Sequence, residues 1–185
     1  MLIINLIMPK LLEITELGSP VLRRKAVPIE HIPSKKLIEL VEDMIYTVSR
    51  VNGVGLAAPQ VSESIRLFIM ASEPNPRYPD APDMEPVALI NPEIISGSEE
   101  VIKGWEGCLS IPGLRGLVPR HRSVKISFQN IDGNEVINEF SDFTARIFQH
   151  EFDHINGIVF LDRLESTRDI ITDKEYEKLL KKNES

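Results

Sequence analysis

The chain has 185 residues, of which 42% are hydrophobic and 26% are charged, as is usual for a globular protein with one core. Its formal net charge of -7 argues against nucleic-acid binding, because affinity for phosphates depends mainly on clustered lysines and arginines. The single cysteine excludes an internal disulfide and favours a reducing compartment. We therefore expect a cytoplasmic protein that forms one domain, residues 1–185.

The N-terminal residues 1–8, MLIINLIM, are apolar but lack the basic leader and cleavage site of a signal peptide. They are also too short to cross a bilayer, so we expect no membrane association. The segment could pack on the body or be partly disordered.

A first helix is predicted for residues 33–51, which begin with a proline and are followed by Gly53. Its apolar residues recur three and four positions apart, as in an amphipathic helix: Leu37, Leu40, Val41, Met44, Ile45 and Val48. The next segment, GVGLAAPQ at 53–60, is too rich in glycine to predict a regular element.

Three segments rich in isoleucine, valine and phenylalanine predict strands at 66–71, 87–95 and 124–129. Asp132 and Gly133 indicate a hairpin that links the third strand to Val136 and Ile137. Residues 72–86 contain five prolines and predict an irregular surface excursion, either a lid or a plain insertion.

Helical spacing returns at residues 142–156, where Gly157 ends the pattern, and again at about 172–182. Without an internal repeat or a dividing linker, strands and a few helices predict an α+β fold. We expect antiparallel or mixed sheets around the helix that carries HEFDH, with one helix in the N-terminal half and one at the C-terminus.

The segment QHEFDH at 149–154 carries the clearest chemical signal. His150 and His154 are one helical turn apart, so both imidazoles can reach one metal ion, with Glu151 beside them as an acid/base group. Two surface histidines on a helix are the alternative. Because a catalytic zinc-like site uses three protein ligands, a third is needed, and Cys108 is the obvious candidate, although a lone buried cysteine is more often a small hydrophobe.

Three motifs, GVGLAAPQ at 53–60, EGCLS at 106–110 and QHEFDH at 149–154, together resemble the signatures of the peptide deformylases of the bacterial and organellar type. The resemblance covers nearly the whole chain, from about Gly18 to Arg163.

The resemblance implies that Cys108, His150 and His154 bind a metal ion, which we expect to be Fe(II), with Zn(II), Ni(II) or Co(II) as possible substitutes. It implies a hydrolase that removes the formyl group from the initiator N-formylmethionine of new polypeptides and releases formate. A metal-activated hydroxide would attack the formyl carbon, with Glu151 taking up the proton and returning it to the leaving amine. The Gln60 amide and the Leu109 backbone N–H would stabilise the oxyanion, whereas the residues alone slightly favour Gln60 as a polar cap on a turn.

The resemblance also implies a bound peptide in an extended conformation and a pocket for the methionine side chain. The residues at the matching positions are Val54, Gly55, Arg115 and Ile147, and for each side chain a core or surface role is the alternative. It further suggests that Arg120 pairs with Asp153, which would otherwise be an unpaired buried charge next to His154.

The short basic cluster of Arg115, Arg120, His121, Arg122 and Lys125 is interpreted as a solvated strand end rather than a nucleic-acid site.

An inactive metal-binding or ribosome-docking relative is the second hypothesis for the function, but Glu151 and Gln60 are both present. A zinc peptidase is disfavoured because no further ligand follows His154. Ribosome docking itself stays open, since residues 167–185 carry five basic and five acidic side chains: Arg168, Lys174, Lys178, Lys181 and Lys182 against Asp169, Asp173, Glu175, Glu177 and Glu184.

Overall fold

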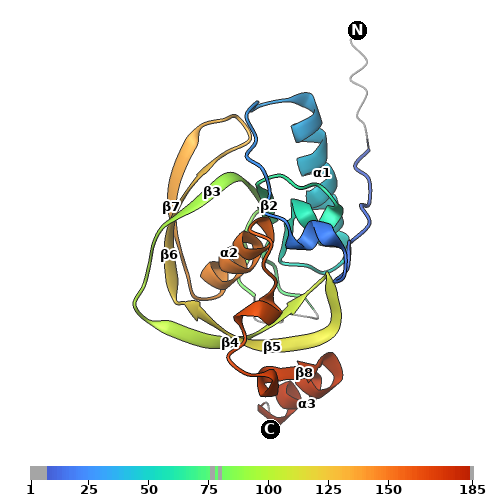
Figure 1. Cartoon of the computed structure of the whole chain (residues 1–185), viewed down its shortest axis with the longest axis vertical. Coiled ribbons are helices and arrows are strands. Elements are labelled where there is room, and N and C mark those ends of the chain that lie inside the picture. The colour runs from blue at the N-terminus through green and yellow to red at the C-terminus, as the bar shows by residue number, and fades with distance from the viewer. Residues whose placement is uncertain (1–7, 76–77, 79–80, 184–185) are drawn as a thin grey trace.

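The computed structural model describes residues 8–75, 78 and 81–183, so the expectation for residues 1–8 lies almost wholly outside the described residues. Two antiparallel sheets lie around the helix α2, which occupies the centre of Figure 1. The predicted α+β fold is therefore confirmed. Among the described residues, no helix is long and apolar enough to span a membrane.

The helix α1, Lys35–Arg50, confirms the predicted first helix. The Ser34 side chain caps its N-terminus by accepting a hydrogen bond from the backbone N–H of Leu37. One face of α1 packs on the core, with these residues buried: Leu37, Val41, Met44, Thr47 and Val48. The apolar spacing read from the sequence is thus the face that the helix buries.

The larger sheet has five strands in the order β1-β2-β3-β6-β7, with antiparallel pairing throughout. Their bounds are Gly55–Ala57 (β1), Leu67–Met70 (β2), Val87–Gly97 (β3), Ser123–Gln129 (β6) and Glu135–Ser141 (β7). All three predicted strands are present. The predicted hairpin is also confirmed, since Gln129 pairs with Glu135 across a turn in which Gly133 has a φ of 85°.

The segment 53–60 corrects the sequence-based expectation of an irregular stretch. Its residues form the short strand β1 and the 3-10 helix Ala58–Val61, and Leu56 and Ala57 are fully buried. Three-residue strands carry almost no periodic signal, and pairing with β2 decides this one. Gly55 is required here because a Cβ at this position would overlap the Glu151 side chain.

The smaller sheet, in the order β4-β5-β8, was not predicted. It contains Val101–Cys108 (β4), Ile111–His121 (β5) and Ile170–Thr172 (β8). Glycines and prolines interrupt the alternation of β4 and β5, and these residues normally argue against a strand. Long-range pairing overrides that preference, for example where Lys103 lies opposite Pro119.

The helix α2, Asp142–Ile155, is confirmed as predicted and packs on both sheets. Most of its residues are buried, including charged ones on the face that carries the histidines. Gly157, at a φ of 75°, follows its C-terminus and donates its N–H to the His154 carbonyl. The predicted C-terminal helix is α3, Asp173–Asn183, which lies below β5 in Figure 1.

The proline-rich segment 72–86 contains no helix or strand within its described residues, as expected; residues 76–77 and 79–80 lie outside them. Tyr78 reaches back from this segment to the body, where its hydroxyl is 3.3 Å from the Gly107 carbonyl oxygen. Tyr78 therefore lies against the end of β4.

Candidate active site

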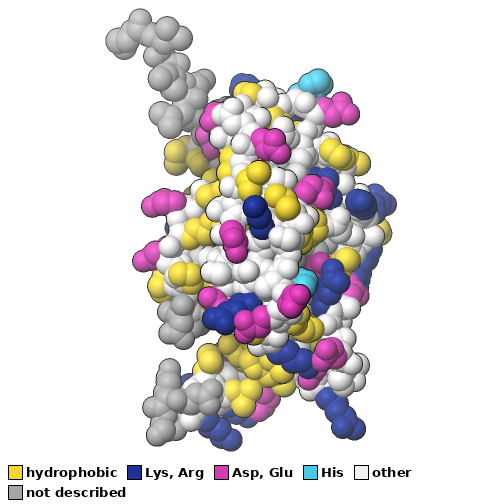
Figure 2. Space-filling view, turned by 90° about the vertical axis from the view of Figure 1, so that its left-hand side faces the viewer, with side chains coloured by type: hydrophobic (Ala, Val, Ile, Leu, Met, Phe, Trp, Pro, Cys, Tyr) yellow, Lys and Arg dark blue, Asp and Glu magenta, His cyan; other side chains and the backbone are white. Residues whose placement is uncertain are grey.

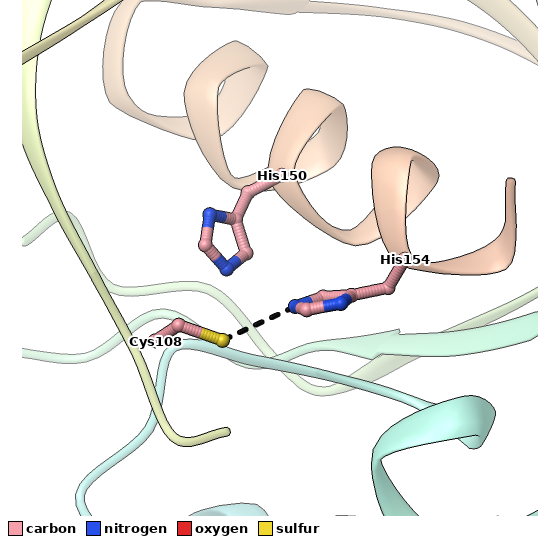
Figure 3. A group of neighbouring side chains, drawn as sticks. All are labelled: Cys108, His150 and His154. Carbon is pink, nitrogen blue, oxygen red and sulfur yellow. Dashed lines mark hydrogen bonds between the residues drawn. The ribbon is translucent and has the colours of Figure 1, made fainter. Parts of the chain in front are cut away.

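Cys108, His150 and His154 come together at the centre of the molecule, where the end of β4 meets α2 (Figure 3). Their potential ligand atoms all lie within 4.8 Å of one another, and all three residues are buried. Cys108 Sγ lies 3.2 Å from His154 Nε2. The sequence predicted both histidines on one helix face with Cys108 as the candidate third ligand, and the fold brings this cysteine to them from a strand that ends 42 residues before His150.

The electrostatics of Cys108 suit a metal ligand. Burial alone would raise the pKa of the thiol, but the neighbouring His154 and His150 bring the pKa well below its usual value. A thiolate is the form of cysteine that binds metal ions. One thiolate and two imidazoles form a donor set that fits Fe(II), Zn(II), Ni(II) or Co(II).

His150 is held in the orientation that a metal ligand needs. Its Nδ1 donates a hydrogen bond of 2.9 Å to Glu106 Oε2, because an ionised carboxylate can only accept. This bond fixes the tautomer and leaves Nε2 free for a metal ion.

Glu106 links this histidine to two buried arginines. Arg120 donates two hydrogen bonds to its carboxylate, and Arg146 donates a third at 2.9 Å. Burial alone would raise the pKa of Glu106, but Arg120 and the bond from His150 hold the pKa far below its usual range. Glu106 is therefore a permanent carboxylate behind the candidate metal ligand His150.

No role was predicted from the sequence for Glu106 or Arg146. Glu106 stood within the EGCLS motif, and Arg146 lies one helical turn before His150, a spacing that places both on one face of α2. That spacing was the signal available for Arg146. Its guanidinium also donates to the carbonyl oxygens of Val118 and Ile102, which ties α2 to β4 and β5.

The predicted contact between Asp153 and Arg120 is confirmed, with Arg120 Nη1 2.6 Å from Asp153 Oδ2. Arg163 donates two more hydrogen bonds to the same carboxylate. The basic cluster around it needs a correction, since Arg115 and Arg120 are only 4% and 5% exposed and are not a solvated strand end. Both guanidinium groups can be buried because carboxylates from α2, α3 and β4 compensate their charge.

Glu151 projects from α2 next to Gly55 and is 4% exposed. Its Oε2 is buried and has no hydrogen-bond partner among the described residues. Burial raises the pKa of this carboxyl to about 7, against the opposing effect of His150 and His154. A carboxyl that titrates near neutral pH can take up and return a proton.

Gln60 is fixed by its own turn. Its Oε1 accepts the backbone N–H of Ala57 at 2.8 Å, so Nε2 points to Ser110 Oγ at 3.2 Å and to Cys108 Sγ at 3.5 Å. The side chain therefore caps the turn, as the bare sequence favoured, and its Nε2 also lies beside Cys108.

A cavity opens beside these residues. Of the four predicted peptide-binding residues, Val54, Gly55 and Ile147 line it, whereas Arg115 lies behind its wall, against Gly107. Gln60, Leu109 and Glu151 also face the cavity. Its other lining residues include Tyr78, Trp105, Phe143 and Arg146, none of which the sequence analysis singled out.

Comparison with known proteins decides the family. A model of the polypeptide deformylase family matches residues 11–169. The chain belongs to this family. Peptide deformylase 2 of Nostoc sp. is 54% identical over 175 residues, which cover 95% of this chain and 98% of the relative. Peptide deformylase 2 of Shewanella oneidensis is 44% identical over 83% of this chain and 84% of its own.

Solved deformylase structures share the fold. The class I type b peptide deformylase of Acinetobacter baumannii, with Met-Ala-Ser bound, superposes with a TM-score of 0.83 at 45% identity and covers 85% of this chain and 100% of its own. The enzyme of Thermotoga maritima gives a TM-score of 0.76 at 39% identity, over 85% of this chain and 99% of its own. Peptide deformylases are metal-dependent hydrolases that remove the N-formyl group from newly made polypeptides, and this chain carries their Cys/His/His arrangement.

Proposed function

We propose that Cys108, His150 and His154 hold one divalent ion in the centre of the deformylase site. The observation that carries this proposal is the convergence of three buried ligand atoms within 4.8 Å, next to a carboxyl group whose pKa is raised to about 7. When bound, such an ion lowers the pKa of a water molecule and polarises a carbonyl group.

Glu151 is the proposed acid/base residue. Its unpartnered Oε2 accepts the proton of the attacking water, and the neutral carboxyl then protonates the departing α-amine. The products are formate and a free N-terminus. The burial of Glu151 supports this role, since it disfavours the charged form and so keeps the two protonation states close in energy near neutral pH.

The Gln60 side-chain amide and the Leu109 backbone N–H are the proposed hydrogen-bond donors to the oxyanion that forms on the formyl oxygen. The bond from Ala57 holds Gln60 in place before substrate arrives, so no side-chain reorganisation opposes the reaction. Leu109 follows Cys108 directly and lines the same cavity.

A formyl-methionine peptide is the proposed substrate, and its first side chain enters the cavity between Val54, Ile147 and Phe143. The peptide backbone would pair with the edge of β4, because β5 is the only strand beside it in the described part of the chain. Both the N–H and the C=O of Gly107 contact the Tyr78 hydroxyl, at 3.4 and 3.3 Å, and so point away from β5. These are the groups that an extended peptide would use.

Fe(II) is the proposed physiological ion, with Zn(II), Ni(II) and Co(II) as substitutes, and the cytoplasm is the proposed location.

We also propose that residues 1–185 act as one catalytic domain and that any contact with the ribosome is weak. Basic and acidic side chains alternate over the face in Figure 2, without a broad basic area there, and α3 has acidic residues in its first turn as well as lysines in its last. Ribosomal RNA would require a more basic surface.

An anaerobic assay of formyl-Met-Ala-Ser hydrolysis, with metal analysis of the same sample, tests the proposal. We expect release of formate by protein that contains about one equivalent of iron, and loss of activity in air as the ferrous ion and thiolate are oxidised. Absence of formate release from protein with a full equivalent of Fe, Ni or Co would overturn the proposal.

A further inference from the structure

The first turn of α3 holds the side chain of Arg115. Arg115 Nε donates a hydrogen bond of 2.7 Å to Asp173 Oδ1, and Arg115 Cζ lies 4.8 Å from the ring centre of Tyr176. Asp173 and Tyr176 are three residues apart, so they lie on the same face of the helix. A hydrogen bond and a ring contact together fix the plane of the guanidinium.

The same guanidinium lies against the proposed peptide-binding edge. Arg115 pairs with Gly107 across β4 and β5, and a Cβ at Gly107 would lie only 2.9 Å from Arg115 Nε. Arg115 Nη1 is buried and has no hydrogen-bond partner among the described residues. An unpaired buried donor costs free energy, which a carbonyl oxygen of a bound peptide would recover.

The helix also supports the cavity wall. The ring centres of Tyr176 and Trp105 are 6.0 Å apart, and Trp105 lines the cavity. The short strand β8 anchors α3 at this place, because it pairs Ile171 with Arg115 immediately before the helix begins. Figure 1 shows α3 directly below β5.

We propose that Asp173 and Tyr176 are positioning residues for the deformylase reaction. They hold Arg115 so that its Nη1 can bind the peptide backbone beyond the formylated residue. Asp173 is partly exposed, so its ion pair with Arg115 adds little to the binding energy. Its contribution to substrate binding is to orient the Arg115 guanidinium. This inference rests on the proposed function and assigns α3 a role in substrate recognition.

The test compares Asp173→Ala and Tyr176→Ala with the wild-type holoenzyme on two substrates, formyl-Met-Ala-Ser and formyl-methionine amide. We expect KM for the tripeptide to rise about tenfold, because one hydrogen bond to a charged group is lost, while kcat stays within about twofold. The amide does not extend beyond the first residue, so its KM should not change. Tyr176→Phe keeps the ring and should restore the wild-type KM.

Glu177→Ala is the matched control, since it removes one negative charge from an exposed position of the same helix. Equal changes for both substrates, or no change for either, would overturn the inference. If Tyr176→Ala loses its fold or its metal, Asp173→Ala still decides the matter through the same comparison of the two substrates. A wild-type enzyme inactive on both substrates would instead contradict the proposed function, so the two failures are distinguishable.

Discussion

At the scale of single residues, Glu106 joins the proposed metal ligand His150 to the rest of the protein. It accepts hydrogen bonds from His150, Arg120 and Arg146 and is 3% exposed. A neutral amide at this position would leave the two buried guanidinium groups with less compensating charge and would weaken the hold on His150.

We therefore predict that Glu106→Gln lowers the affinity for the metal ion by about 10- to 100-fold. Competition with a chromophoric chelator measures this affinity. The control is Glu100→Gln, because Glu100 pairs with Arg122 at the surface, where both side chains are about half exposed. Equal affinities of the Glu106 and Glu100 variants would contradict the prediction.

Glu151 lies beside the three proposed metal ligands, but its proposed role is proton transfer and not metal binding. We predict that Glu151→Ala retains the metal ion and loses about 10²- to 10⁴-fold in kcat, as expected for removal of a general base. Formate release and metal analysis of one sample measure both quantities. Wild-type turnover by the metal-loaded variant would refute the assignment.

At the scale of elements, α1 stabilises the fold without contributing a side chain to the site. Met44 is fully buried in the cluster that contains Val48, Leu56 and Ile69, and β1 in that cluster continues into the turn that holds Gln60. Packing of α1 thus supports the segment from which the site is built.

We predict that Met44→Ala lowers the free energy of unfolding by about 2–5 kcal/mol, through loss of buried area and formation of a cavity. Urea unfolding followed by circular dichroism measures it. Ile38→Ala is the control on the same helix, since Ile38 is 39% exposed and should cost much less. Similar losses for the two variants would show that the buried face of α1 has been wrongly assigned.

At the scale of the whole molecule, the proposed metal ion connects the two sheets. Cys108 ends β4 in the smaller sheet, whereas both histidines lie on α2, which packs mainly on the larger one. An ion bound by all three would favour the folded over the unfolded state, in which the ligands are far apart.

We predict that free metal at 100 times its dissociation constant stabilises the protein by about 2.7 kcal/mol. Thermal unfolding with and without a chelator measures this effect as a lower Tm of the metal-free form. Cys108→Ala should unfold at a temperature that the chelator hardly changes. A chelator effect of the same size in wild type and in this variant would place the ion elsewhere.

The elements differ in how well the sequence predicts them. Helices α1 and α2 followed from apolar spacing, and the β6–β7 hairpin followed from Asp132 and Gly133, because these signals are local. Strands β4 and β5 were missed, since Gly104, Gly107 and Pro119 weaken the local pattern and only pairing between the strands stabilises them. The burial of Arg115 was missed for a related reason, as its carboxylate partner Asp173 comes from the distant helix α3.

The sequence by itself determined the chemistry available to this protein: two histidines and a glutamate on one helix, and one cysteine and one glutamine in upstream motifs. The tertiary structure alone decided their arrangement, because the distances between Cys108, His150 and Gln60 depend on how β4, α2 and the turn after β1 pack together. It also decided the supporting contacts of Glu106, Arg146 and Arg115. These are charges whose burial is stable only when the fold brings opposite charges to them.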